Sequence, residues 1–208
     1  MTGRILFSCS DDEAVARCAS VVKRGGVVVF PTDTVYGIGC DPYNDEAVAR
    51  VFAIKGRNKT KPLPVLAYNT EAAESIVILG NAGKALARRY WPGALTIVAP
   101  IKDHRICRTL TAGSSSLAVR VPANKCVLSL LSHCGYIVGT SANRSGEKPP
   151  TSFQEVLASS LDDYDALLDG GQTEKGLEST IVDITGKPKI LREGAVSMRE
   201  VLEVLEKL

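Results

Sequence analysis

Apolar residues recur at helical spacing in several stretches of the chain. Between Asp11 and Arg24, they fall three and four positions apart, at Ala14, Val15, Cys18, Ala19 and Val22. Ser10 or Asp11 can cap the first turn, and Gly25-Gly26 stops the pattern, so the stretch predicts a helix. The same criteria predict helices over Asp45 to Lys55, Thr70 to Ile76, Asn81 to Tyr90, Asn124 to His133, Phe153 to Ser159, and from Ser197 to the C-terminus.

Short apolar runs between these helices predict strands. Val27 to Phe30 has no polar alternation, which is typical of a strand covered on both faces. Further strands are expected at Pro64 to Tyr68, Leu95 to Ala99, Ser116 to Val121, Tyr136 to Gly139, Ala166 to Asp169, Ser179 to Ile184 and Lys189 to Arg192. Helices and strands alternate early, whereas strands follow one another later. This order predicts an α/β fold with a mixed sheet flanked by helices.

Composition supports one folded domain over residues 1–208. Hydrophobic residues make up 45% of the chain and charged residues 23%, which is enough for a core. The formal charge is only +2, so an anion-binding site must be a local feature and not a property of the whole surface.

Six scattered cysteines contain no C-x-x-C pair, which argues against a zinc site and a disulfide scaffold. We therefore expect free thiols in a reducing cytosol. The first twelve residues lack a signal-peptide pattern, and no later run approaches the ~20 apolar residues of a membrane span. The sequence thus predicts a soluble, cytoplasmic protein.

Common catalytic signatures are absent. Neither G-x-x-x-x-G-K-[ST] nor G-x-G-x-x-G occurs, and the two histidines, His104 and His133, have no metal-ligand spacing. Thr140-Ser141-Ala142-Asn143 lacks the glycines of a nucleophile elbow. No resident metal site is expected.

Polar residues instead gather at the ends of predicted strands, where open α/β sheets bind ligands. The groups are Pro31 to Gly39, Lys55 to Pro62, Ser116 to Pro122, Ser141 with Asn143, Asp169 to Asp183, and Leu191 to Ala195. Cations and hydroxyls together suggest a nucleotide plus a second small polar metabolite. Capping turns and solvated basic loops explain the same residues without a ligand.

Two of these groups allow sharper expectations. Period-2 alternation places Ser116, Ala118 and Arg120 on one strand face, and a buried guanidinium needs either an internal carboxylate or a bound anion. We favour a ligand as the anion. Trp91 to Thr96 is interpreted mainly as a structural corner around the tryptophan.

The ordered motifs resemble the YrdC family. They read PTDTVYGIGCD from Pro31, KGRNKTKPLPVL from Lys55, WPGALT from Trp91, AVRVP from Ala118, GTSAN from Gly139, STIVD from Ser179 and LREGAV from Leu191. More narrowly, they resemble the threonylcarbamoyl-AMP synthases, over about Val21 to Val196. The resemblance implies a twisted, open α/β sheet with a basic concave face.

The resemblance also implies an activity. These nucleotidyltransferases convert L-threonine, bicarbonate and ATP to L-threonylcarbamoyladenylate and pyrophosphate. A separate complex then transfers the threonylcarbamoyl group to tRNA beside the anticodon. Mg²⁺ would arrive with ATP, and double-stranded RNA or tRNA is an additional expected ligand.

Site residues carry over by motif. Lys55, Arg57, Ser141 and Asn143 resemble the family's catalytic set. On the same basis, Thr34, Arg120, Ser141 and Ser179 would surround L-threonine, and Arg57, Lys61, Ser116, Asn143, Thr151 and Arg192 would contact ATP. The glycine-rich segment from Gly170 to Gly176 would serve as a lid that excludes water from labile intermediates.

The chain also departs from the family. Leu66 stands where some relatives carry a histidine, and the linker and C-terminal domain of a larger subfamily are absent, so we expect the single-domain form. Three alternatives stay open: a non-catalytic RNA-binding module, a YciO-like branch member, and a carbamoyl-adenylate enzyme. The 5% aromatic content disfavours the first, and the full K-G-R and S-A-N set argues against the second. The third works beside zinc-binding and acylphosphatase-like domains, for which 208 residues leave no room.

Overall fold

A computed structural model describes residues 4–208 and contains two mixed sheets. The five-stranded sheet has the order β1 (Ile5–Ser8), β9 (Ala166–Asp169), β2 (Val28–Phe30), β3 (Gly37–Gly39) and β8 (Thr140–Ser141). The six-stranded sheet has the order β11 (Lys189–Arg192), β10 (Thr180–Asp183), β5 (Leu95–Pro100), β6 (Ser116–Arg120), β4 (Val65–Ala67) and β7 (Tyr136–Val138). Both sheets combine parallel and antiparallel pairs, as the order of elements predicts.

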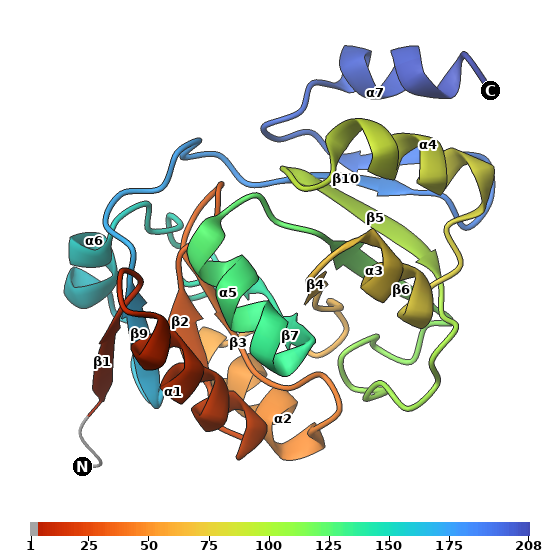
Figure 1. Cartoon of the computed structure of the whole chain (residues 1–208). Helices are drawn as coiled ribbons and strands as arrows, with labels where there is room; N and C mark the ends of the chain where they lie inside the picture. The colour runs from red at the N-terminus through yellow and green to blue at the C-terminus, as the bar shows by residue number, and fades with distance from the viewer. Residues whose placement is uncertain (1–3) are drawn as a thin grey trace.

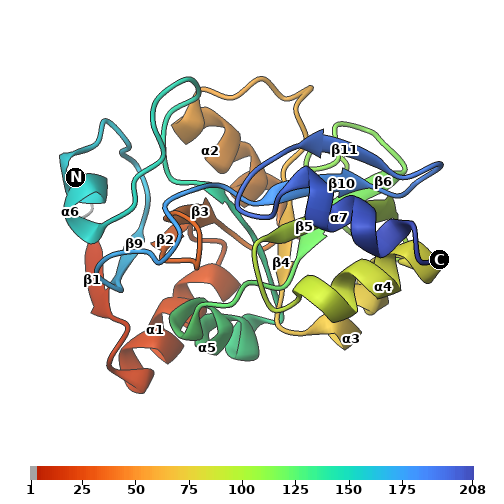
Figure 2. The ribbon, with the colours of Figure 1, turned by 90° about the horizontal axis from the view of Figure 1, so that it is seen from above.

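Seven helices of the described residues flank the sheets. They are α1 (Asp12–Lys23), α2 (Asp45–Lys55), α3 (Thr70–Ile76), α4 (Gly80–Tyr90), α5 (Lys125–Cys134), α6 (Phe153–Ala158) and α7 (Met198–Leu205). Helix α1 packs against the five-stranded sheet and against α5, and α5 also contacts β7 of the six-stranded sheet (Figure 1). Helix α4 packs against α7 and against β5 of the six-stranded sheet. Seen from above, the two sheets stand side by side, and β1 and the C-terminus lie on opposite sides of the molecule (Figure 2).

Local signals explain where the helices begin and end. The Asp11 side chain accepts hydrogen bonds from the first turn of α1, and Asn44 does the same for α2. Gly56 ends α2 in the left-handed conformation, with φ of +56°. Ser197 and Glu200 form a reciprocal capping box at α7. These residues are the same start and stop signals that the sequence displays.

The predicted helices and strands are confirmed, most of them to within one or two residues, but three strands were missed. Strand β3 reads Gly-Ile-Gly, β8 has only two residues, and β1 lies in an N-terminal stretch for which no element was expected. All three strands belong to the five-stranded sheet. The expected α/β fold with mixed strands flanked by helices is confirmed, but its strands form two sheets and not one.

Strand β2 separates two hydrophobic layers. Val27 and Val29 belong to the core between the sheets, whereas Val28 and Phe30 face the core under α1 and α5. All four are fully buried, which confirms the strand expected to be covered on both faces.

The expectation of six free thiols is wrong for one pair. Cys9 and Cys126 form a disulfide, with their Cα atoms 5.3 Å apart. They are 117 residues apart in sequence, and the packing of α1 on α5 brings the start of each helix together. Spacing along the chain carries no sign of such a pair. Cys18, Cys40, Cys107 and Cys134 are free.

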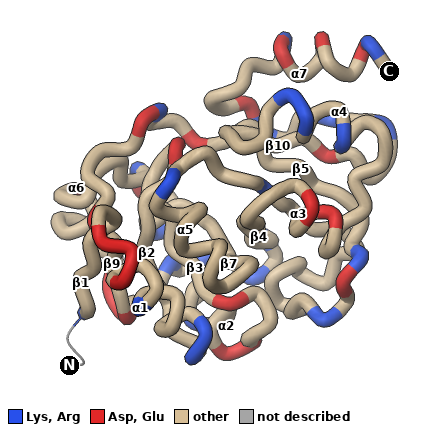
Figure 3. The backbone as a smooth tube through the Cα atoms, viewed as in Figure 1, with Lys and Arg blue, Asp and Glu red and all other residues tan. Residues whose placement is uncertain are grey.

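Charged groups of both signs are interspersed along the chain, as Figure 3 shows for the face in view. No helix in residues 4–208 is both long enough and apolar enough to span a bilayer.

The two sheets meet where β3 crosses β7. The Val138 N–H donates to the carbonyl of Cys40 at 2.8 Å, and the chain then continues through Gly139 into β8 of the other sheet. A Cβ on Gly39 would lie 1.5 Å from the Val138 carbonyl oxygen. Only glycine permits this approach of the two backbones.

We predict that Gly39→Ala lowers the free energy of unfolding by about 3 kcal/mol or more, because backbone and not a flexible side chain must move. Urea denaturation of both proteins measures the difference. Gly186→Ala is the control, since its added methyl group meets nothing within 4 Å, and it should change stability by less than about 0.5 kcal/mol. Equal effects at both positions would contradict the close crossing.

Candidate active site

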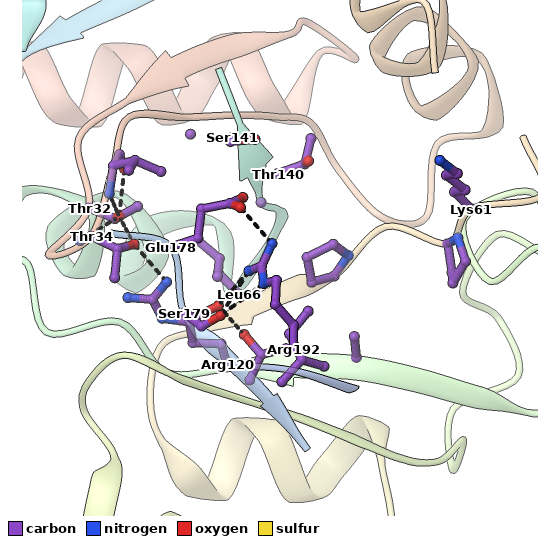
Figure 4. A pocket seen from close by; sticks show the side chains of 18 of the residues that line it. Thr32, Thr34, Lys61, Leu66, Arg120, Thr140, Ser141, Glu178, Ser179 and Arg192 are labelled. Carbon is purple, nitrogen blue, oxygen red and sulfur yellow. Dashed lines mark hydrogen bonds and ion pairs between the residues drawn. The ribbon is translucent and has the colours of Figure 1, made fainter. Parts of the chain in front are cut away.

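A cavity of about 410 Å³ opens at the junction of the two sheets. Its floor is one face of the six-stranded sheet, with Leu66, Val98, Ala118 and Ile181 as its apolar part. The loop after β2 supplies one wall, and segment Arg57 to Pro64 supplies another. Figure 4 shows side chains from these elements pointing into the same space. All six polar groups found in the sequence therefore contribute residues to the cavity, although only Ser141 of the Ser141 and Asn143 pair lines it.

Arg120 lies at the inner end of the cavity floor. Strand alternation places it on the same face as Ala118, as predicted, and its side chain is almost wholly buried. Nε donates to the Gly93 carbonyl at 2.8 Å, Nη1 to the Thr34 hydroxyl at 2.9 Å, and Nη2 to the Asp33 carboxylate at 2.6 Å. These three bonds fix the plane of the guanidinium.

The expectation that a ligand serves as the anion for Arg120 is corrected. Asp33 is fully buried and provides an internal carboxylate, whose Oδ1 also accepts the Ala123 N–H at 3.1 Å. Desolvation lowers the pKa of Arg120, and the Asp33 charge counteracts this effect. Because Arg120 also lines the cavity, the ion pair holds it in place and leaves two of its five N–H groups for a ligand.

The basic loop contributes Arg57 and Lys61 to the cavity wall. Arg57 folds back on its own loop, with Nε donating to the Lys61 carbonyl at 3.1 Å and Nη2 to the Pro62 carbonyl at 3.0 Å. Desolvation lowers its pKa, partly offset by the charge of Glu178. The Arg57 charge is thus oriented by main-chain carbonyls.

Arg192 and Ser179 lie on the opposite wall. The Arg192 Nε and Nη2 atoms donate to the Ser179 carbonyl at 3.1 and 2.9 Å, and Nη1 pairs with Glu178 at 2.8 Å. The Ser179 hydroxyl shares a 2.8 Å hydrogen bond with Thr96. Thr96 also lines the cavity, so Trp91 to Thr96 is more than the structural corner expected from the sequence.

Lys55 is buried behind the cavity and does not line it. Its Nζ donates to the carbonyls of Ser141 and, at 2.7 Å, Asn143. Burial lowers its pKa to about 8. The lysine therefore holds the loop on which Ser141 reaches the cavity.

Asn143 lies beside this lysine and also outside the cavity lining. Its Nδ2 donates to the carbonyls of Arg144 and Glu147 at 2.9 and 2.7 Å, whereas its Oδ1 is buried with no partner in residues 4–208. An unpaired buried amide oxygen is costly.

Of the eleven residues expected from the sequence, seven line the cavity: Thr34, Arg57, Lys61, Arg120, Ser141, Ser179 and Arg192. Lys55, Asn143, Ser116 and Thr151 do not. Ser116 lies at the far end of β6 from Arg120, and its hydroxyl pairs with Ser114 at 2.8 Å. The Thr151 hydroxyl donates to Glu155 in the first turn of α6. Their expected contacts with ATP stay predictions.

Sequence reasoning missed several residues of the cavity. Thr32 and Thr140 belonged to recognised loops but were not chosen, and Glu178 directly precedes the STIVD motif. For the apolar residues of the cavity floor, strand alternation was the only sequence signal. The position of Glu178 directly before the STIVD motif was the one sequence signal that could have added it to the candidate site.

The glycine-rich segment is anchored on the site. The Lys175 and Gly176 N–H groups donate to the carbonyls of Asp33 and Thr34 at 3.1 and 3.0 Å, and the Thr173 N–H donates to the Thr151 carbonyl at 2.7 Å. The segment thus rests on the backbone that carries Thr34. Its role as a lid stays a prediction.

The described part of the chain contains no group of three or more His, Cys, Asp or Glu side chains arranged to hold a metal ion. The cations of the cavity suit an anionic ligand.

We predict that Asp33→Asn lowers the free energy of unfolding by about 3 kcal/mol, because it leaves Arg120 buried without its counter-ion. Urea denaturation measures this loss. Asp163→Asn is the matched control, since Asp163 is 82% exposed and its 3.9 Å pair with Arg50 should contribute less than about 1 kcal/mol. Equal losses in the two variants would show that the buried Asp33–Arg120 pair contributes no more to the free energy of unfolding than an exposed pair.

We also predict that Lys55 makes stability depend on pH. Its pKa lies near 8 when folded, against an ordinary 10.5, so between these values the unfolded chain holds a proton that the native state has released. Native stability should therefore rise by about 2 kcal/mol from about pH 7 to about pH 9.5 through this group. Urea unfolding of the original protein and Lys55→Met isolates the effect, and a difference that stays constant with pH would refute it.

Comparison with known proteins agrees with this geometry. The Sua5/YciO/YrdC family model, described as "Telomere recombination", matches residues 20–194. A "Putative threonylcarbamoyl-AMP synthase" of Mycobacterium tuberculosis is 35% identical over 205 residues, covering 96% of this chain and 94% of that protein. The "Threonylcarbamoyl-AMP synthase" of Pyrococcus abyssi is 36% identical over 190 residues, covering 90% of this chain.

The chain spans only 56% of the length of that Pyrococcus relative. A solved structure of Pyrococcus abyssi Sua5 complexed with L-threonine superposes with a TM-score of 0.92 at 33% identity, covering 100% of this chain and 62% of the other. Fold, motifs and relatives agree, and the chain belongs to the Sua5/YciO/YrdC family.

Proposed function

We propose that this protein is a threonylcarbamoyl-AMP synthase, a nucleotidyltransferase that uses L-threonine, bicarbonate and ATP. The observation that carries the proposal is one cavity lined both by the Arg120, Thr34 and Ser179 cluster and by the cations Arg57, Lys61 and Arg192. The names of the relatives and the L-threonine complex of the Pyrococcus protein support it.

The Arg120 end of the cavity suits an amino acid. Arg120 and Asp33 together carry little net charge, which favours a zwitterion such as L-threonine over a multiply charged anion. The free N–H groups of Arg120 would bind the threonine carboxylate. The hydroxyls of Thr34 and Ser179 would hold the remaining polar groups of the amino acid.

The cationic end suits a polyphosphate. Threonine and bicarbonate give the carbamate and water, and a carbamate oxygen then attacks the α-phosphorus of ATP. The bond to the β-phosphate breaks and pyrophosphate leaves, carrying its Mg²⁺. Arg57, Lys61 and Arg192 would neutralise the charge on the leaving group, while Lys55 would hold the Ser141 loop against the reacting atoms.

The product would pass to a separate complex that modifies tRNA beside the anticodon. A mixed carboxylic–phosphoric anhydride hydrolyses readily in water, so a rapid transfer partner is chemically required. Bound tRNA or double-stranded RNA would place that partner close to the cavity.

Pyrophosphate release from ATP and Mg²⁺ tests the proposal, with L-threonine and bicarbonate each present or omitted. Release should need both, and mass spectrometry should detect threonylcarbamoyl-AMP. Arg57→Ala should lower the rate about 10²- to 10³-fold, because a guanidinium facing the phosphates is lost. Release that needs neither co-substrate, or RNA binding without any turnover, would reject the synthase.

A further inference from the structure

Within residues 4–208, Glu178 is the only carboxylate that lines the cavity. Four cationic side chains line the same cavity, those of Arg57, Lys61, Arg120 and Arg192. In Figure 4 the side chain of Glu178 lies beside that of Arg192, and a dashed line joins the two. An acid at the centre of a site suited to phosphates opposes anion binding and therefore calls for an explanation.

The ion pair between Glu178 and Arg192 is exchangeable. The two side chains retain 37% and 38% exposure, and their contact involves only Nη1 of the guanidinium, at 2.8 Å. Nε and Nη2 of Arg192 are held separately by the Ser179 carbonyl. Arg192 can thus lose the carboxylate and keep its orientation.

Glu178 is also free to leave. Its backbone is fixed, since its carbonyl accepts the Ala195 N–H at 2.9 Å. Its carboxylate makes no hydrogen bond in residues 4–208 other than that to Arg192. Displacement therefore needs only a side-chain rotation toward solvent, with no movement of β10 or β11.

The partners of the other cations indicate which kind of ligand would displace the Glu178 carboxylate. Arg120 already has the buried partner Asp33, whereas Arg57 is held by carbonyls and has no carboxylate within 4 Å in the part of the chain that the structure describes. Glu178 lowers the positive potential around Arg57 as well as Arg192, and it raises the pKa of Arg57 against desolvation. A ligand that brings several anionic oxygens would satisfy both cations at once.

We propose that Glu178 is a resident anion that occupies Arg192 in the ligand-free cavity and is displaced by the phosphate oxygens of ATP. The inference rests on the proposed function and adds a specificity determinant to it. Every anion that uses Arg192 must first replace the carboxylate, at nearly the same cost. Polyphosphates recover this cost through several cations, whereas inorganic phosphate or a monocarboxylate does not.

Calorimetric binding of pyrophosphate and of ATP in EDTA tests the proposal without turnover. Glu178→Gln should bind both ligands about two- to fivefold more tightly than the original protein, the range expected for release from a half-exposed ion pair. Glu193→Gln is the matched control. It removes the same charge one residue from Arg192 but lies outside the cavity lining, so its affinities should stay unchanged.

Thermal unfolding of Glu178→Gln should match that of the original protein, since the ion pair is half exposed. Unchanged or weaker binding by Glu178→Gln in EDTA would overturn the proposal. Weaker binding confined to samples with Mg²⁺ would overturn it in favour of a metal-binding carboxylate. If the original protein bound neither ligand, the proposed function would fail as well, whereas normal binding with no effect of Glu178 would reject this inference alone.

Discussion

The buried ion pair between Arg120 and Asp33 joins the two halves of the molecule. Arg120 belongs to β6 of the six-stranded sheet, and Asp33 follows β2 of the five-stranded sheet. A charge pair this deeply buried needs further hydrogen bonds, and Gly93, Thr34 and Ala123 supply three of them, while Asp33 Oδ2 has no partner in residues 4–208. The same contacts that orient the sheets therefore form the inner end of the cavity.

Three cations at or behind the cavity are oriented mainly by main-chain carbonyls. Arg57 uses its own loop, Arg192 uses Ser179, and Lys55 uses the carbonyls of Ser141 and Asn143. A carbonyl fixes the direction of a cation without cancelling its charge, whereas a carboxylate does both. Arg57 thus remains available as a positive charge in the cavity, and Glu178 is the one carboxylate of the described lining that reduces the positive potential.

Most of the fold could be predicted from the sequence because its signals are local. Caps at Asp11, Asn44 and Ser197, and the apolar run at β2, depend only on neighbouring residues. Strands β3 and β8 could not be predicted, since a Gly-Ile-Gly segment and a two-residue strand have meaning only through their partners. The Cys9–Cys126 bond was missed for the same reason.

The candidate site, too, could be predicted only where the signal is local in the sequence. Motifs identified the residues that line the cavity, such as Arg57 and Ser179, because these chemical groups recur in a fixed order. They did not reveal that Lys55 acts from behind the Ser141 loop or that Asp33 is the partner of Arg120. Such relations depend on burial and on contacts between distant segments, which spacing does not record.

Orientation by main-chain carbonyls has a consequence for how the site tolerates change. A carbonyl is the same in every amino acid, so the aim of Arg57 does not depend on which side chains stand at positions 61 and 62. Arg192 is likewise directed by the backbone at position 179, whatever its side chain. Side chains in the loops around the cavity can therefore be substituted, and the ligand preference of the site can change with them. The orientation of Arg57 and Arg192 is kept as long as the backbone of these loops keeps its path.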